Sequence, residues 1–500
     1  MEATPLPAVT GDVVEEPASE GQEHGSALRI GALSVVGSVA IALASAAPTA
    51  SIALTLSAIV AAAGYASPVA VLVCGVPMLG IAVAYRRLNM WHVNCGGAYI
   101  WAGRAISPYF GFMVGWVIIL AYLVGAMSIV LPIGPNALQL FDNSYQHSQT
   151  AAALIGTVAL VFVTAVAYVG IRATARLQVL LIAIEYIALT ILAVIALVAV
   201  FGGDSRSASF DWSWFSWGTL GGTSGFVSAS LIAVYMYSGW DTAILLNEET
   251  ENARVSPGNA VVISVIGLAV IFAVFTFALQ GAVKSGALQA NGDNALVYIA
   301  GTLGNSALAK VMVLTVVLSA VGSGLACIVS GARVLFAMGY DRVIPSAFGR
   351  THSSFRTPTL ATIVGAVVAL VALWGYAKCS GSVVSAFDTV ISTVGLLFAL
   401  FYAATGFAVA VYYRRLARRS VRGTLEIIVF PLASALFLCF IMWKSVGDLG
   451  GWTSSTMQYL YYMLAAGIAL MAYARWRGES DYFQLPVETY TPPDELERQA

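Results

Sequence analysis

A carboxyl group lies inside an apolar stretch of the chain, where Ser238-Gly239-Trp240-Asp241 interrupts residues 223–247. If this stretch crosses a membrane, a carboxylate in its middle costs roughly 2.5–3.5 kcal/mol on insertion scales. Ionised Asp241 would attract an ammonium or guanidinium group of a ligand. The alternative is a structural carboxylate that pairs with a neighbouring helix. We therefore treat Asp241 as a candidate for binding an organic cation.

A second interruption lies in the first apolar run, where Pro48 stands about twenty residues into residues 28–63. Proline removes a backbone donor and clashes with the preceding turn, so carbonyls near Ala44 and Ser45 would lose their usual partners. Pro48 also suits the first position of a second half-helix, whose free N–H groups would face the break. A simple kink is the alternative interpretation.

Glu185 is a second carboxyl group in an apolar run, about eight residues into residues 177–201. Burial favours the protonated form of such a group, so Glu185 is a candidate for binding and releasing a proton. Ser319 and Ser323 are its candidate partners, because their spacing puts them on one helix face. A structural carboxylate and a sodium ligand are the two alternatives.

The elements that must position these residues are membrane helices, because 59% of the 500 residues are hydrophobic and only 10% are charged. Windows of bilayer-crossing length give twelve segments. These are residues 28–63, 67–86, 108–132, 150–170, 177–201, 223–247, 257–283, 306–338, 357–377, 383–413, 423–443 and 453–474.

The basic residues predict the orientation of these segments. With both termini in the cytoplasm, 19 of the 24 lysines and arginines fall on the cytoplasmic side. Residues 1–27 and 475–500 are predicted to be cytoplasmic tails, and the acidic first tail and the Pro-rich and acidic end of the second to be disordered. Glu248, Glu249, Glu251 and Arg254 would form a cytoplasmic ion-pair cluster or a plain solvated helix end.

Several classes of function are disfavoured by the sequence. The five cysteines and four histidines lack metal-ligand spacing, so we expect no metal site and no cofactor. A Walker motif and a Ser/His/Asp constellation are absent from the sequence, which argues against an enzyme or a primary pump. The net charge of −1 gives no reason to expect a nucleic-acid partner.

Four stretches together resemble the amino acid–polyamine–organocation (APC) transporter superfamily, of the amino acid permease type. They are AYRRLNMWHVNCGGAYIWAGRAISPYFGFMVGW (84–116), GIRATARLQVLLIAIEY (170–186), the sixth segment with EETENARVSPGNA after it, and SGARVLFAMGYDRVIPSAFGRTHSSFRTP (330–358). The resemblance covers residues 28 to 475 and implies a LeuT-type fold. In that fold, residues 28–201 and 223–413 are two inverted five-helix repeats, residues 423–474 form two further helices, and helices 1 and 6 are broken.

The resemblance also implies where substrate binds, between the two breaks. Carried over by position, the site comprises Ser45, Ala46, Ala47, Pro48, Thr49, Tyr122, Tyr237, Ser238, Gly239, Trp240 and Asp241. Many family members have a Gly-rich break in helix 1, whereas this chain has Ser-Ala-Ala-Pro. The β-carbons crowd that break, so polyamines and basic amino acids stand beside neutral amino acids as candidate substrates.

The sequence thus predicts a secondary transporter in the cell membrane that moves an amino acid or related organic amine by alternating access. A proton is the expected coupling ion, with sodium second. A polyamine or cationic amine transporter and an amine exchanger are the alternatives within this class. An amine-binding membrane sensor is the alternative outside it.

Overall fold

The computed structural model describes residues 28–141, 148–216, 218, 222–291, 294–379 and 383–491. These residues form helices and connections, with one isolated β-bridge between Leu33 and Thr250. In this part of the chain, eight helical stretches are long and apolar enough to cross a membrane. The first of these stretches, Val35–Trp91, contains three α-helices. The chain is therefore an all-helical membrane protein.

Each of the twelve predicted segments contains a helix. The first half of the chain holds α1 (Val35–Ser45), α2 (Pro48–Ala63), α3 (Ser67–Trp91), α4 (Ala98–Ala105), α5 (Pro108–Leu138), α6 (Gln149–Val169) and α7 (Ile171–Phe201). The second half holds α8 (Gly222–Met236), α9 (Thr242–Leu245), α10 (Ser256–Gln280), α11 (Ser285–Ala290), α12 (Ala295–Leu303), α13 (Ser306–Tyr340), α14 (Thr359–Cys379), α15 (Val383–Tyr412), α16 (Val421–Gly423), α17 (Phe430–Asp448) and α18 (Ser455–Arg477).

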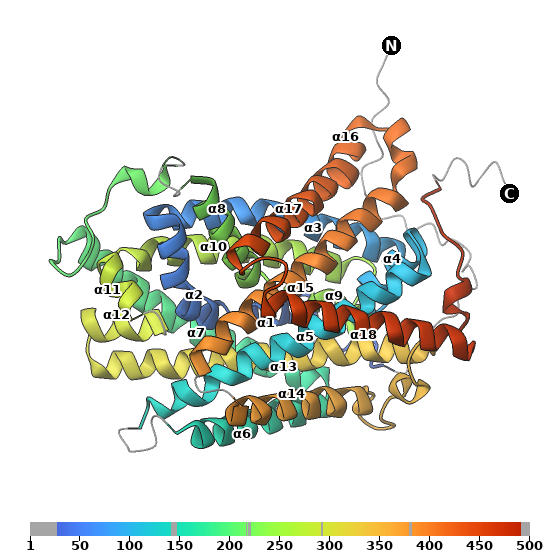
Figure 1. Cartoon of the computed structure of the whole chain (residues 1–500), viewed down its shortest axis with the longest axis horizontal. Coiled ribbons are helices and arrows are strands. Elements are labelled where there is room, and N and C mark those ends of the chain that lie inside the picture. Colours follow the sequence, from blue (N-terminus) through green and yellow to red (C-terminus); the bar gives the residue numbers. More distant parts are fainter. Residues whose placement is uncertain are drawn as a thin grey trace, which may run out of the picture.

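Two long helices, α5 and α13, pack along each other through the middle of the molecule (Figure 1). Around them, α3 packs on α10, α15 on α5 and α17, and α6 on α14. The short broken segments α1, α2, α8 and α9 lie between these longer helices, and each is in contact with at least one of them. The long helices therefore form a frame that encloses both interruptions.

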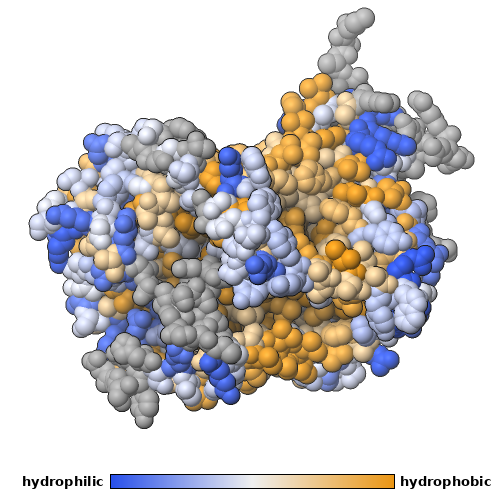
Figure 2. Space-filling model, in the orientation of Figure 1, coloured by the Kyte–Doolittle hydropathy of each residue, from blue (hydrophilic) through white to orange (hydrophobic). Residues whose placement is uncertain are grey.

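The surface fits a protein embedded in lipid. Figure 2 shows apolar residues gathered over the right-centre of the visible face and hydrophilic residues toward both ends of its long axis. Large apolar side chains are exposed on lipid-facing helices, such as Val158 on α6, Val198 on α7 and Val371 on α14. Exposing so many large apolar side chains to water would be unfavourable, whereas contact between these side chains and lipid hydrocarbon is favourable.

The connection between α7 and α8 closes over one end of the molecule. The ring of Trp214 stacks on Tyr65 at 4.8 Å between centroids. Nearby, the Arg206 guanidinium bonds both carboxylate oxygens of Asp204 and lowers the pKa of that carboxyl to about 2. Trp214 is buried in this connection, whereas Trp212 is 78% exposed.

The chain after α18 departs from the prediction of a disordered tail. Residues 478–491 are packed across the end of the bundle, and Tyr482 is only 3% exposed because its ring stacks on Tyr99. Burial raises the pKa of the Tyr482 phenol well above its usual range. Further along, Glu488 forms an ion pair with Arg104 on α4 at 2.7 Å. The prediction was wrong for this part of the tail, because polar composition does not reveal one aromatic anchor. The remaining tail residues, 1–27 and 492–500, lie outside the described residues.

Candidate functional site

The first interruption is a break between α1 and α2. Helix α1 ends at Ser45, and Pro48 is the first residue of α2, as the proline rule predicts. Between them, Ala47 has a φ of 45°, a left-handed conformation that a residue with a β-carbon rarely adopts. The helix is therefore interrupted here, and carbonyl and N–H groups at the break need partners outside the helix.

The second interruption is a break between α8 and α9, and it touches the first. Helix α8 ends at Met236 and α9 begins at Thr242. Gly239 has a φ of 100°, and a β-carbon built on it would lie 2.6 Å from Ser45 Oγ. A glycine is therefore required both for the backbone conformation and for the contact between the two breaks.

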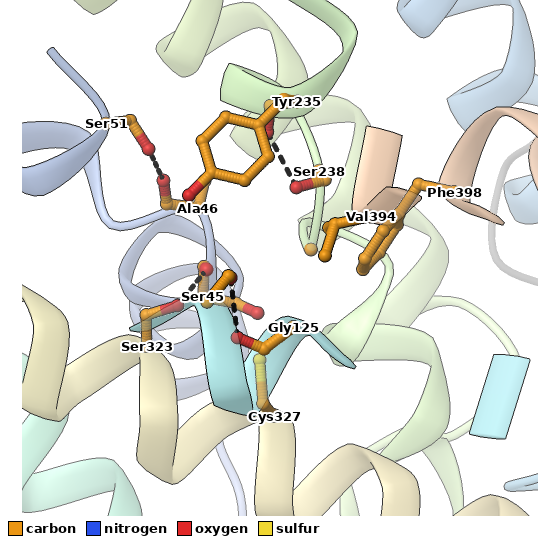
Figure 3. Close-up of a pocket in the computed structure, with 12 residues that line it drawn as sticks. Ser45, Ala46, Ser51, Gly125, Tyr235, Ser238, Ser323, Cys327, Val394 and Phe398 are labelled. Atoms are coloured by element: carbon orange, nitrogen blue, oxygen red, sulfur yellow. Dashed lines mark hydrogen bonds between the residues drawn. The ribbon is translucent and has the colours of Figure 1, made fainter. Parts of the chain in front are cut away.

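A small cavity of about 20 Å³ lies at this contact, which is room for about one water molecule. Figure 3 shows its walls converging from α1, α5, the α8–α9 break, α13 and α15. The predicted site residues on these walls are Ser45, Ala46, Ser238, Gly239 and Ser323. The other lining residues are Ser51, Gly125, Ser128, Tyr235, Cys327, Val394 and Phe398.

The remaining predicted residues lie around the cavity without lining it. Tyr237 points away, because its hydroxyl donates to the Val71 carbonyl on α3 at 3.2 Å. The Tyr122 hydroxyl shares a hydrogen bond with Thr242 Oγ1 at 3.2 Å, and Thr242 Oγ1 donates to Ser45 Oγ at 3.0 Å. Thr242 thus links Tyr122 to the first break. Seven of the predicted substrate-binding residues do not line the cavity: Ala47, Pro48, Thr49, Tyr122, Tyr237, Trp240 and Asp241.

Asp241 is fully buried beside the cavity, among aromatic rings. Its Oδ1 accepts a hydrogen bond from the Tyr402 hydroxyl at 2.7 Å, while its Oδ2 has no partner among the described residues. Trp240 stacks on Tyr402 at 4.8 Å, and Tyr85 meets Trp240 edge-on at 5.2 Å. A buried carboxylate oxygen without a donor is costly, so this group is suited to receive one from a ligand.

Tyr402 also holds the second break in place. Its hydroxyl accepts a hydrogen bond from the Gly239 N–H at 3.2 Å while it donates to Asp241. Sequence reasoning missed this residue, because Tyr402 lies 161 positions after Asp241 in an apolar helix where a tyrosine gives no local signal. The lining residues on α5 and α15 were missed for the same reason.

The predicted coupling residues come together on the other side of the first break. Glu185 on α7 is buried, with Thr49 and Ser319 beside its carboxyl group. The Ser319 Oγ accepts from the Ala50 N–H at 3.3 Å, and the Ser323 Oγ donates to the Ser45 carbonyl at 2.6 Å. The two serines of α13 thus satisfy one backbone group on each side of the break. Glu185 Oε2 has no partner within the described part of the chain.

The chain after α9 closes one end of the site. Glu249 is buried and forms an ion pair with Arg333 on α13, with 2.9 Å between Oε2 and Nη2. Its backbone carbonyl accepts from the N–H groups of Ala32 and Leu33, just before α1. Glu249 therefore pairs with Arg333, not with the nearby Arg254, whose Nε donates to the Met90 carbonyl. The described residues contain no group of three His, Cys, Asp or Glu side chains arranged for a metal ion.

Comparison with known proteins identifies the family. The model of the amino acid permease family matches residues 32–468. The chain belongs to the amino acid permease family. This permease is therefore a transporter and not an enzyme, as the sequence predicts.

Several curated relatives are similar to this permease. It is 25% identical to a low-affinity putrescine importer of Escherichia coli, over 72% of this chain and 77% of the relative. It is 22% identical to a branched-chain amino acid permease of Bacillus subtilis, over 60% and 65% of the two chains. It is 25% identical to a serine/threonine exchanger of the same organism, over 55% and 61%.

Among solved structures, the permease resembles a manganese transporter of Eremococcus coleocola, crystallised in complex with an aromatic bis-isothiourea substituted compound. The TM-score is 0.61 at 13% identity, and the match covers 88% of this chain and 94% of the other. This likeness shows the shared fold.

Proposed function

We propose that this permease is a proton-coupled secondary transporter of a small organic cation, either a polyamine or a basic amino acid. In this proposal it works by alternating access in a LeuT-type arrangement of two inverted five-helix repeats plus two helices, with both termini in the cytoplasm. Substrate binds between the two helix breaks, where backbone groups and the Asp241 carboxylate converge. Neutral amino acids are the second candidate class.

The observation that carries this proposal is the unpartnered Oδ2 of Asp241. The carboxylate is buried at the C-terminal side of the second break and surrounded by Tyr85, Trp240 and Tyr402. A negative charge among aromatic rings favours an ammonium group, which gains both the ion pair and the attraction of the ring faces. The similarity to a putrescine importer is in keeping with this chemistry.

The first break favours the polyamine among the two proposed substrates. Where a Gly-rich break would offer bare N–H groups to an α-carboxylate, this chain has Ala46 and Ala47. The Ser45 carbonyl accepts from Ser323, and the Ala50 N–H donates to Ser319, so two of the exposed backbone groups are already satisfied. Fewer free N–H groups remain there for a carboxylate, and this favours a polyamine over an α-amino acid, whether basic or neutral.

A cavity of about 20 Å³ is too small for a diamine, so this conformation is closed around the site. Substrate entry in our proposal requires the half-helices to move against the frame of α5 and α13. Because Tyr402 bonds both Gly239 and Asp241, movement of this side chain would uncover the carboxylate together with the break.

Uptake by purified protein in proteoliposomes tests the proposal. We expect labelled putrescine or arginine to accumulate against its gradient, and Asp241→Asn to lower uptake at least tenfold, since a neutral amide loses the ion pair. Glu251→Gln removes an exposed carboxylate ten residues further on and should leave uptake unchanged.

Two results would redirect the assignment. If Asp241→Asn transports at the wild-type rate, or if only neutral amino acids accumulate, the cation proposal fails. Binding of these compounds in a thermal-shift assay without any accumulation would indicate a sensor instead of a transporter.

A further inference from the structure

A groove between α6 and α14 lies away from the proposed substrate site and has a volume of about 480 Å³. One wall is formed by side chains on one face of α6 and the other by side chains on one face of α14, and most of these side chains are apolar. The lining residues are Leu160, Val161, Thr164, Ala165, Tyr168, Val169, Ile363, Ala366, Val367 and Leu370. The two helices lie side by side at the lower edge of the molecule (Figure 1).

The groove is bounded at both ends by contacts between the helices. At one end, Trp374 Nε1 donates to Thr157 Oγ1 at 2.9 Å. At the other, Thr357 Oγ1 donates to the Tyr168 carbonyl at 3.0 Å. Between these two hydrogen bonds the groove runs roughly 13 Å along α6, from Leu160 to Val169. The Thr164 hydroxyl donates to the Leu160 carbonyl of its own helix, so it needs no hydrogen-bond partner from a ligand in the groove.

The end of the groove near Thr357 is positively charged. Arg172 and Arg176 are exposed at the start of α7, two and six residues after Gly170. Arg356 is exposed on the opposing segment, and a β-carbon built on Gly170 would lie 3.8 Å from the carbonyl oxygen of the preceding Phe355. Within the described residues these three arginines have no ion-pair partner.

We propose that this groove binds one anionic phospholipid, with an acyl chain between α6 and α14 and the headgroup phosphate on Arg172, Arg176 and Arg356. Both halves of the ligand are specified by the molecule: an apolar slot facing the hydrocarbon and a set of unpaired guanidinium groups at its end. Guanidinium groups bind phosphate through paired, charge-assisted hydrogen bonds. Basic pockets beside membrane helices attract anionic headgroups in this way.

The consequence concerns the frame of the transporter. Helix α6 packs on α5 and α13, and α14 packs on both of these helices as well. A lipid that fills the space between α6 and α14 adds contacts to this frame in the folded state alone. It therefore stabilises the protein by mass action, and this effect is independent of which substrate the transporter carries.

The experiment titrates purified full-length protein in detergent with phosphatidylglycerol or with phosphatidylcholine of the same acyl chains, and follows the melting temperature. We expect phosphatidylglycerol to stabilise at lower concentration. Arg172→Gln with Arg356→Gln should weaken its apparent affinity about 25-fold, at about fivefold for each arginine. Arg422→Gln, an exposed arginine on α16, is the charge control and should change nothing.

A second pair of variants tests the slot itself. Val367→Trp fills the groove and should abolish the stabilisation by either lipid, whereas Val371→Trp, one turn away on the exposed surface of α14, should retain it. Equal effects of the two lipids, or the same loss in Arg422→Gln, would overturn the proposal. Conversion of a dimer to a monomer by Val367→Trp would show a second copy as the occupant, and would overturn it too.

Discussion

At the scale of single residues, the proton hypothesis rests on Glu185. This carboxyl group is buried between α7 and the first break, and its Oε2 has no partner in the described chain. A protonated carboxyl can remain there at little cost, whereas an ionised one needs a cation or a donor. We propose that the side chain takes up a proton from one side of the membrane and releases it on the other.

We predict that Glu185→Gln uncouples transport from pH. Wild-type uptake should rise as external pH falls from 8 to 5.5, because the protonated carrier loads from the more acidic side. Glutamine cannot exchange a proton, so the variant should give a flat profile and no accumulation driven by a pH gradient. Initial uptake rates in proteoliposomes measure both.

The control for this variant is Tyr186→Phe. It removes the neighbouring hydroxyl, which also has no hydrogen-bond partner among the described residues, and should keep the wild-type pH profile. A Glu185→Gln protein that still follows pH would refute the proton role. If uptake at constant pH strictly requires sodium, then sodium and not a proton is the coupling ion.

At the scale of elements, the contact between the two breaks depends on Gly239. We predict that Gly239→Ala lowers uptake at least tenfold, since the new methyl group would stand 2.6 Å from Ser45 Oγ on a backbone with φ of 100°. Strain of this kind costs on the order of 1–3 kcal/mol, which the melting temperature should register.

Gly267→Ala provides the comparison. Its methyl group would meet only Leu43, at an ordinary 3.7 Å, within a continuous helix. It should therefore transport and melt like the wild type, or slightly better. If both alanine variants behave alike, the two breaks do not need their close approach.

The sequence predicts these elements well where the chemistry is local. Pro48 restricts the backbone, and Gly239 permits a positive φ that other residues rarely adopt, so both breaks can be located without coordinates. Tyr402 and the ion pair between Arg333 and Glu249 could not be found in this way. They join positions 161 and 84 residues apart, and neither has a periodic pattern to mark it.

The tail after α18 illustrates the opposite error. Its polar composition predicts disorder, yet the Tyr482 ring packs between α4 and α5, where a β-carbon on Gly103 or Gly111 would lie 2.4 Å from the Tyr482 hydroxyl. Two small residues on other helices create the space for this ring. Composition averages over such single contacts, and therefore cannot predict them.

At the scale of the whole molecule, alternating access requires one site to open to each side in turn. Cys327 is a native reporter of this, because it lines the cavity and is 5% exposed. We predict that a variant with Cys327 as its only cysteine reacts with a membrane-impermeant maleimide from either face of the membrane. The reaction should be slow, since the closed conformation leaves room for about one water molecule.

Saturating substrate should slow this labelling severalfold from both faces, because substrate occupies the space next to the thiol. A variant with Glu251→Cys as its only cysteine, at an exposed position away from the cavity, should label at a rate that substrate does not change. Labelling of Cys327 from one face alone, in both right-side-out and inverted vesicles, would contradict alternation. That result would indicate a protein that binds its ligand from one side only, because a transporter must expose the same residue to the solutions on both sides of the membrane.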